Sequence, residues 1–211
     1  MAAESERTWG GKTLEDRRAA RRARLLDAGY DLLGTGGAAA VTVRGVCRAA
    51  RLTERYFYES FADRDELVVA VHTRTAAEAR DAIAAAVVAA APEPAAVATA
   101  AVEAFVELLQ DDPRRGRVLL TEVFADELLT RAGVELIPSF AALLIEQIRA
   151  MYGDGGPDGV DAELTSVALV GALAHLFSGW LDGTLAVGRE RLVAHVVALI
   201  IAAAPVSSRE R

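Results

Sequence analysis

The chain has 211 residues, 53% of them hydrophobic, which is enough for one large domain or two small ones with a sizeable core. Helix-favouring residues dominate and strand-like alternation is scarce, so the composition predicts an all-α fold. A single cysteine, Cys47, excludes a disulfide framework and a cysteine metal site. The N-terminus lacks a secretory signal, and the longest apolar runs fall short of the roughly 20 residues that span a bilayer. We therefore expect a soluble, cytoplasmic protein with no membrane partner.

Charge is distributed unevenly along the sequence. The net charge is −7, but residues 12–55 hold ten basic and five acidic residues, so this segment carries +5 and the remainder −12. A basic block on an acidic chain indicates that one part of the molecule meets a polyanion. A solvated, arginine-rich helix face would produce the same pattern, so charge alone leaves both interpretations open.

The first predicted helix follows a short polar segment. Residues 1–12 are expected to form a mobile N-terminal arm. Thr13 can cap a helix that begins at Leu14, with Asp16 in its first turn. Glycines within residues 34–37 supply the backbone conformation that ends it. Most of the arginines of the basic block lie in the first half of this helix.

Three further helices are expected to follow in close succession. Thr42 and Thr53 can cap two short ones, and Asp63 can open a longer one, with Glu66 completing a capping box. The longer helix can continue until the prolines that begin at Pro92. The expected ranges are 43–50, about 54–60, and 63 to about 91.

The rest of the sequence also predicts helices. Glycine and proline clusters divide it into segments at about 94–110, 114–129, 133–152, 160–185 and 189–204. The predicted organisation is an N-terminal three-helix domain and a larger C-terminal helical domain. The expected boundaries are 1–12 for the arm, 13–62 for the first domain, 63–205 for the second and 206–211 for a tail.

The two short helices have the pattern of a helix-turn-helix. Small apolar residues recur at helical spacing on the first of them, and Phe57 and Phe61 fall on the inner side of the second. Tyr56 and Tyr58 then face outward beside Arg55. Such a surface is typical of a helix that enters a DNA major groove, where arginine reads guanine and tyrosine hydroxyls bind phosphate.

The segment VTVRGVCRAARLTERYFYESFADRDEL, residues 41–67, resembles the DNA-binding signature of the tetracycline-repressor (TetR) family of bacterial transcriptional regulators. The resemblance implies that Tyr58 and Arg64 contact phosphates and that Thr42 and Thr53 cap helices pointing at the DNA backbone. The family usually has glycine in the turn where this chain has Arg51. The predicted DNA-binding residues are Thr42, Arg44, Thr53, Glu54, Arg55, Tyr56, Tyr58 and Arg64.

The same resemblance implies that the C-terminal helices form a homodimer and hold a small molecule. One face of the 160–185 helix and one face of the last helix are predicted to form the dimer interface: Leu164, Val167, Gly171, His175, Ser178, Leu192, Val196 and Leu199. Inward aromatic and apolar residues are predicted to line a pocket: Phe105, Phe124, Val170, Leu173, Phe177 and Trp180. Ordinary packing within one monomer is the alternative for both sets.

These features together predict a DNA-binding transcriptional regulator, more often a repressor than an activator, that binds a palindromic operator as a dimer. A mostly apolar effector of unknown identity is expected to release it. No catalytic group, cofactor or metal site is expected, since the histidines lack ligand spacing. The alternatives are a helical ligand carrier or enzyme whose basic face does not read DNA, and a nonspecific DNA-compacting protein.

Overall fold

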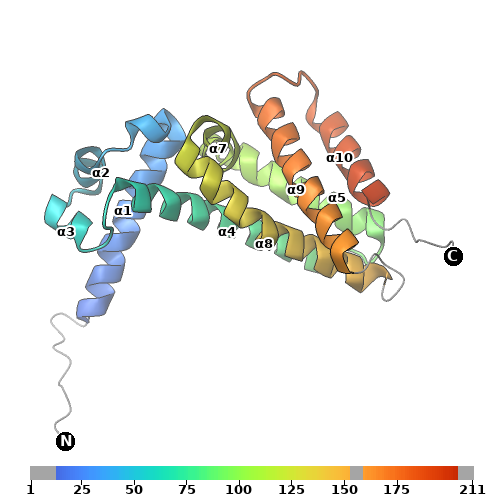
Figure 1. Cartoon of the computed structure of the whole chain (residues 1–211), viewed down its shortest axis with the longest axis horizontal. Helices are drawn as coiled ribbons and strands as arrows, with labels where there is room; N and C mark the ends of the chain where they lie inside the picture. Colours follow the sequence, from blue (N-terminus) through green and yellow to red (C-terminus); the bar gives the residue numbers. More distant parts are fainter. Residues whose placement is uncertain (1–12, 153–158, 204–211) are drawn as a thin grey trace, which may run out of the picture. The chain divides into compact units, whose positions relative to one another are not determined.

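The computed structural model describes residues 13–152 and 159–203 (Figure 1). The expected arm at 1–12 and tail at 206–211 lie outside this range. The described residues form helices and no strand, as the sequence predicts. The chain divides into two compact units between Val71 and His72, whereas the expected domain boundary lies between residues 62 and 63.

The N-terminal unit is a small helical domain whose helices begin close to the expected positions. It consists of α1 (Leu14–Gly36), the 3-10 turn η1 (Ala38–Ala40), α2 (Val43–Ala50), α3 (Glu54–Tyr58) and the first two turns of α4 (Arg64–Ala89).

Local hydrogen bonds explain where these helices begin. Thr13 and Asp16 form a capping box at α1, and the Thr42 hydroxyl accepts a hydrogen bond of 3.0 Å from the backbone N–H of Gly45. Thr53 occupies the N-cap position of α3, but its side chain makes no capping hydrogen bond, so that part of the prediction is wrong. Asp63 accepts from the backbone N–H of Glu66, as expected, but the Glu66 carboxylate accepts from the N–H of Ala62, so the predicted capping box is only half formed.

The core of this unit is closed. Leu25, Val46, Phe57 and Phe61 are each at most 2% exposed. Gly29 marks a close crossing of α1 and α4, because a Cβ atom there would lie 3.1 Å from a methyl group of Val71 and 3.2 Å from one of Leu67. α1 therefore packs directly on the first turns of α4, which explains why those turns belong to the N-terminal unit.

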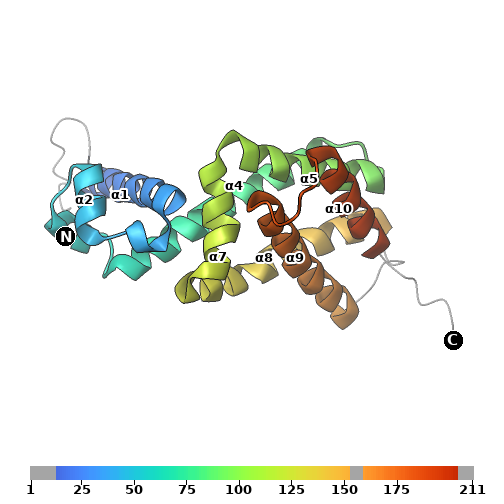
Figure 2. The same cartoon turned by 90° about the horizontal axis from the view of Figure 1, so that it is seen from above.

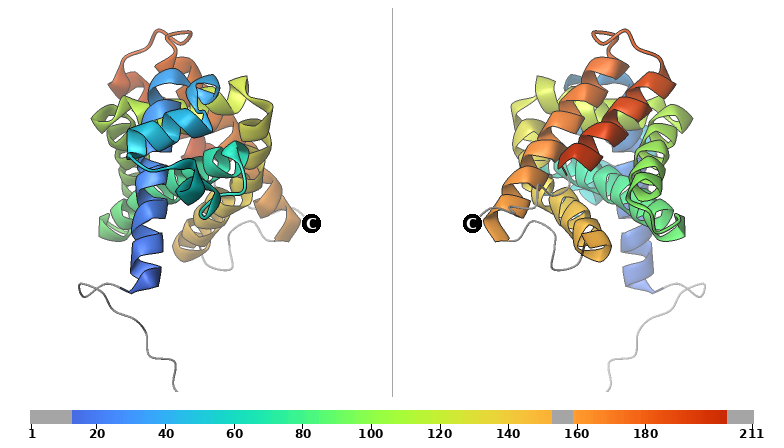
Figure 3. Two further views of the ribbon diagram at one scale, coloured as in Figure 1. Left: turned by 90° about the vertical axis from the view of Figure 1, so that its left-hand side faces the viewer. Right: turned by 90° about the vertical axis from the view of Figure 1, so that its right-hand side faces the viewer.

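The C-terminal unit contains the remainder of α4 and all later helices. These are α5 (Pro94–Asp111), α6 (Pro113–Gly116), the π-helical segment η2 (Arg117–Thr121), α7 (Glu122–Ala125), α8 (Glu127–Tyr152), α9 (Gly159–Leu181) and α10 (Arg189–Ala203). α10 packs on α5 (Figure 2), and α9 and α10 lie side by side (Figure 3).

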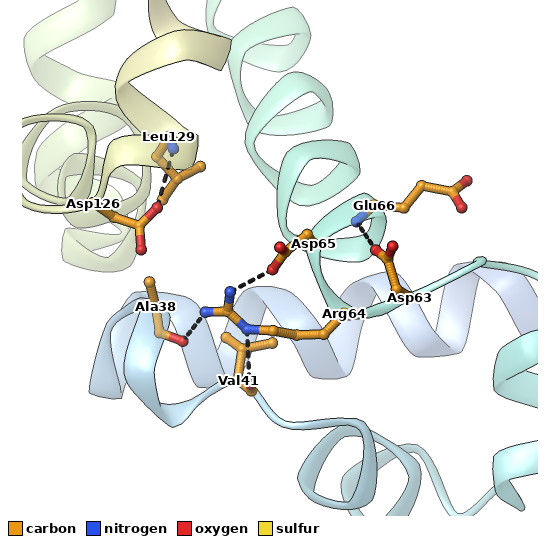
Figure 4. A network of polar contacts seen from close by, with 8 residues as sticks. All are labelled: Ala38, Val41, Asp63, Arg64, Asp65, Glu66, Asp126 and Leu129. Carbon is orange, nitrogen blue, oxygen red and sulfur yellow. Dashed lines mark hydrogen bonds and ion pairs between the residues drawn. The ribbon is translucent and has the colours of Figure 1, made fainter.

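Two predicted boundaries in this unit are wrong. The break expected at residues 130–132 lies instead at Asp126, whose carboxylate accepts a hydrogen bond of 3.1 Å from the N–H of Leu129 (Figure 4). Gly133 is a contact position inside α8, because a Cβ atom there would lie 2.8 Å from Val123. The helix expected to reach residue 185 ends at 181, where Gly183 has a φ of 81°.

Two helices are more apolar than the sequence analysis allowed. The stretches Glu127–Gln147 and Glu163–Leu181 are long and apolar enough to cross a membrane by length and composition, whereas the longest apolar runs were expected to fall short of that length. Only 17% of each stretch is buried within the chain. Two such helices are weak grounds for a membrane protein, but their exposed apolar surface requires an explanation.

Candidate functional site

The outward face of α2 and α3 forms a polar, positively charged surface. The side chains of Arg44 and Arg55 are 91% and 85% exposed. Tyr58 is 56% exposed and Tyr56 is 37% exposed. Thr42, Thr53 and Glu54 are exposed as well. The predicted DNA-binding residues of these two helices thus lie on one side of a domain whose phenylalanines fill its interior.

The arginines of α1 behave differently from those of α2 and α3. The Arg21 guanidinium lies 4.6 Å from the centre of the Tyr56 ring and 3.7 Å from the Glu59 carboxylate. Arg22 lies 4.3 Å from the centre of the Phe61 ring, and Arg24 donates a hydrogen bond to a backbone carbonyl at the end of α2. Part of the basic block therefore holds the helix-turn-helix together, a role that sequence reasoning missed.

Arg64 has structural partners within the same domain (Figure 4). Its Nε donates a hydrogen bond of 3.0 Å to the carbonyl of Val41, and a second nitrogen donates to the carbonyl of Ala38. Its third nitrogen pairs with Asp65 at 2.6 Å. These contacts hold the segment that leads into α2, so they favour a positioning role for Arg64 over the predicted phosphate contact.

The turn between α2 and α3 contains a strained residue. Arg51 has φ 52° and ψ 46°, and it is the one non-glycine residue with positive φ among those described. Its side chain is exposed. Beneath the turn, Cys47 is buried, and burial followed by the charge of Glu54 raises the pKa of its thiol. The thiol is thus a core group, and its raised pKa does not favour the reactive thiolate.

The C-terminal unit contains a cavity of about 350 Å³ that is partly open to solvent. α4, α5, α8, α9 and α10 contribute to its wall, together with the π-helical segment and α7. Of the six residues predicted to line a pocket, five do so: Phe105, Phe124, Val170, Leu173 and Phe177. Trp180 does not line it, and its indole N–H instead donates a hydrogen bond of 3.1 Å to Val187 in the loop after α9.

Three polar side chains border this otherwise apolar cavity. The Thr130 hydroxyl donates to backbone carbonyls of residues 123 and 126, and Gln147 is half-buried. His72 is 2% exposed, and desolvation lowers the pKa of its imidazole to about 4. The imidazole is therefore neutral at neutral pH. Sequence reasoning considered His72 only as a possible metal ligand and did not connect it with the pocket.

The predicted dimer face is only partly exposed. Leu164 is 62% exposed, Val167 is 38% exposed, and His175 is exposed. Leu192 and Val196 are 3% and 0% exposed. They belong to the core of their own unit, so their assignment to a dimer interface is wrong.

The other members of the predicted set divide in the same way. Ser178 is 8% exposed and is also wrongly assigned, because the chain itself covers it. Gly171 borders the cavity, and Leu199 is half-buried. Val160, which was not predicted, is 69% exposed and extends the apolar face of α9 by one turn. The described residues contain no cluster of three or more potential metal ligands.

Comparison with known proteins finds a family match within the N-terminal unit. Residues 25–71 match the sequence model of bacterial regulatory proteins of the tetR family. This range covers the second half of α1, all of α2 and α3, and the start of α4. No curated protein matches the chain by sequence.

Solved structures share the fold of nearly the whole chain. The fatty acid degradation regulator FadR from Bacillus halodurans is 16% identical, with a TM-score of 0.69 over 90% of this chain and 97% of that one. A TetR family regulator from Marinobacter aquaeolei VT8 is 17% identical, with a TM-score of 0.63 over 90% and 98%. A TetR-like regulator from Rhodococcus sp. RHA1 is 19% identical, with a TM-score of 0.61 over 87% and 94%.

Proposed function

We propose that this chain is a regulator of the tetR type, a repressor that binds a two-fold symmetric DNA operator as a homodimer in the cytoplasm. The observation that carries the proposal is the exposed face of α3. It presents Arg55, Tyr56 and Tyr58 outward while Phe57 anchors the helix in the core. A helix held in this way can offer its side chains to a major groove without losing its own packing.

The exposed side chains divide into two proposed roles. Arg55 is long, charged and 85% exposed, so it suits bidentate recognition of guanine. Tyr58 suits a phosphate, which fixes the docking position and carries no base identity. Arg44 adds an exposed charge at the start of α2. The ion pairs of Arg44 with Glu54 and of Arg55 with Glu59 would have to open when DNA replaces the carboxylates.

Dimer formation is supported by apolar surface on α9. Val160, Leu164 and Val167 follow one another at helical spacing and are 69%, 62% and 38% exposed. Covering them with the same face of a second copy would give a two-fold interface. Two reading helices could then reach major grooves about 34–36 Å apart, one helical turn of DNA.

Effector control is supported by the cavity. A small, mostly apolar molecule would fill it, and α4 connects the cavity wall in the C-terminal unit to the N-terminal unit. If the molecule releases DNA, the coupling must be reciprocal: DNA must weaken the binding of the molecule by the same factor. Typical coupling of about 1–3 kcal/mol is enough to empty an operator.

Selection of duplexes from a random library by the purified protein tests the DNA-binding proposal. We expect the recovered sequences to have two-fold symmetry and the affinity to fall steeply with salt, because arginine–phosphate contacts release counterions. Recovered duplexes without symmetry would contradict the symmetric dimer. Failure to retain any duplex would favour the alternative, a helical ligand carrier or enzyme whose basic face does not read DNA.

Two substitutions separate the proposed roles on the selected duplex. Arg55→Ala should weaken binding by roughly 1–3 kcal/mol and relax the preference at one base pair per half-site. Tyr58→Phe should weaken binding to all sequences alike. A Tyr58→Phe protein with an altered preferred sequence and unchanged affinity would show that these roles are assigned wrongly.

A further inference from the structure

His72 has an unsatisfied polar atom in the wall of the cavity. The side chain is 2% exposed, and its Nδ1 makes no hydrogen bond within the described part of the chain. Buried polar groups nearly always have a partner, since leaving one unpaired is unfavourable. An orphan nitrogen that borders a cavity is therefore suited to a bound molecule.

The other polar groups of the wall do not compete for this role. Thr130 already donates its hydroxyl proton to main-chain carbonyls. Gln147 lies on α8 and is only half-buried, so water can satisfy its amide. His72 is thus the one deeply buried polar side chain without a partner for its Nδ1 in the described wall, which is apolar apart from His72, Thr130 and Gln147. The matching ligand has one hydrogen-bonding group on an apolar body.

The shape of the cavity limits the form of that body. Along α4 the lining runs from His72 through Ala76 and Ile83 to Val87, a length of about 22 Å at a helical rise of about 1.5 Å per residue. About 350 Å³ spread along such a wall makes a narrow space. A narrow space fits an extended chain better than a compact ring system. His72 is the first lining residue of α4, so it lies at one end of this wall.

We propose that the cavity binds an extended aliphatic molecule with a single neutral hydrogen-bonding head group, a hydroxyl or a protonated carboxyl, and that His72 holds this head group. The inference rests on the proposed effector site and specifies what that site selects. A neutral imidazole has one donor and one acceptor, so it can satisfy either role of a hydroxyl. A carboxylate fits less well, because it would need a charged imidazole in the same apolar surroundings.

Calorimetric titration of the full-length protein with decanol tests this proposal. We expect decanol to bind, and His72→Phe to weaken its binding about tenfold, as expected when one hydrogen bond to a buried hydroxyl is lost. His72→Asn should retain most of the affinity, because the amide places a polar atom near the position of Nδ1. His195→Phe is the matched control for loss of an imidazole, because His195 is exposed on α10 and does not line the cavity, and it should leave the affinity unchanged.

Adamantanol tests the shape, because it has the same number of carbon atoms and the same head group in a compact form. It should bind more weakly than decanol. Equal affinity of decanol for the wild type and His72→Phe would overturn the role of His72. Tighter binding of adamantanol would overturn the extended shape, and no binding of decanol would overturn the whole inference.

Failure of this inference differs from failure of the proposed function. A protein that selects a symmetric duplex but does not bind decanol refutes only the ligand class. A protein that binds decanol through His72 with the same affinity in the presence and absence of its duplex refutes only the regulatory coupling.

Discussion

The two units of this protein expose chemically opposite surfaces, one charged and the other partly apolar. The N-terminal unit has a closed core and exposes charge, with Arg44 and Arg55 extending from short helices over a fully buried Phe57. The C-terminal unit surrounds a cavity and exposes apolar side chains, with Leu164 the clearest example. An exposed charged surface on a closely packed domain suits binding to a polyanion. An exposed apolar face suits contact with a second copy of the chain, and the cavity suits a small molecule.

The largest expected effect comes from truncating a side chain in the closely packed core of the N-terminal unit. Phe57→Ala should destabilise the N-terminal unit by roughly 3–5 kcal/mol, because a fully buried ring is replaced by a void. Phe105→Ala should be milder, roughly 1–2 kcal/mol, because this half-buried ring borders an existing cavity. Hydrogen exchange measured separately for each unit would detect both effects. Equal losses from the two substitutions would show that the cavity wall is packed as tightly as the N-terminal core.

The features of the N-terminal unit that the sequence predicted correctly are those that depend on local contacts. The range of α2, the capping by Thr42 and the inward direction of Phe57 and Phe61 depend on neighbours within a few residues. Local spacing and capping chemistry were therefore sufficient. The exposed face of α3 followed from the same helical periodicity, since a helix that buries Phe57 must turn its other side outward.

The errors arose where long-range contacts decide the outcome. Both sides of α10 are apolar, so periodicity could not rank them, and Leu192 and Val196 proved to face the core. Gly133 was interpreted as a helix stop, but it serves a close contact with Val123 from another helix. The partners of Arg64 lie 23 and 26 residues away in sequence, and no local pattern identifies them.

A second prediction addresses the exposed apolar face of α9. Leu164→Ala should weaken a dimer by roughly 2–3 kcal/mol, because one buried leucine side chain is truncated in each copy. The dissociation constant would then rise by about one to two orders of magnitude, which sedimentation equilibrium can measure. Val88→Ala is the control, since Val88 is 86% exposed on α4, away from that face. If both substitutions leave the association unchanged, α9 does not form the interface.

A third prediction concerns the histidine of the cavity. Its pKa is lowered from 6.5 to about 4 by burial, so below pH 6.5 the unfolded chain binds a proton that the folded chain does not. Stability should fall by about 2 kcal/mol between about pH 7 and about pH 5 for this reason.

The His72→Phe protein should lose this contribution, so its stability should vary less over the same range of pH. Urea unfolding of both proteins at several pH values would measure the difference in slope. His195→Phe is the matched control, because His195 is exposed on α10. Parallel pH profiles for the wild type and His72→Phe would show that the imidazole is hydrated in the folded protein and is not a dry anchor.

The smallest expected effect concerns the turn between α2 and α3 in the N-terminal unit. It distinguishes the effect of Arg51 on stability from its effect on DNA binding. Arg51 holds φ 52° at the end of α2, where glycine avoids the steric conflict of a side chain. Glycine also raises the entropy of the unfolded chain, which offsets part of the gain. We therefore expect Arg51→Gly to stabilise the N-terminal unit by roughly 0.5–1 kcal/mol.

Arg51→Ala removes the same charge while keeping the strain, so it is the matched comparison. If Arg51 also contacts DNA, both substitutions should weaken binding equally and reduce its salt dependence, whereas only Arg51→Gly should raise the urea midpoint. An unchanged midpoint for Arg51→Gly would mean that the left-handed residue is accommodated without strain.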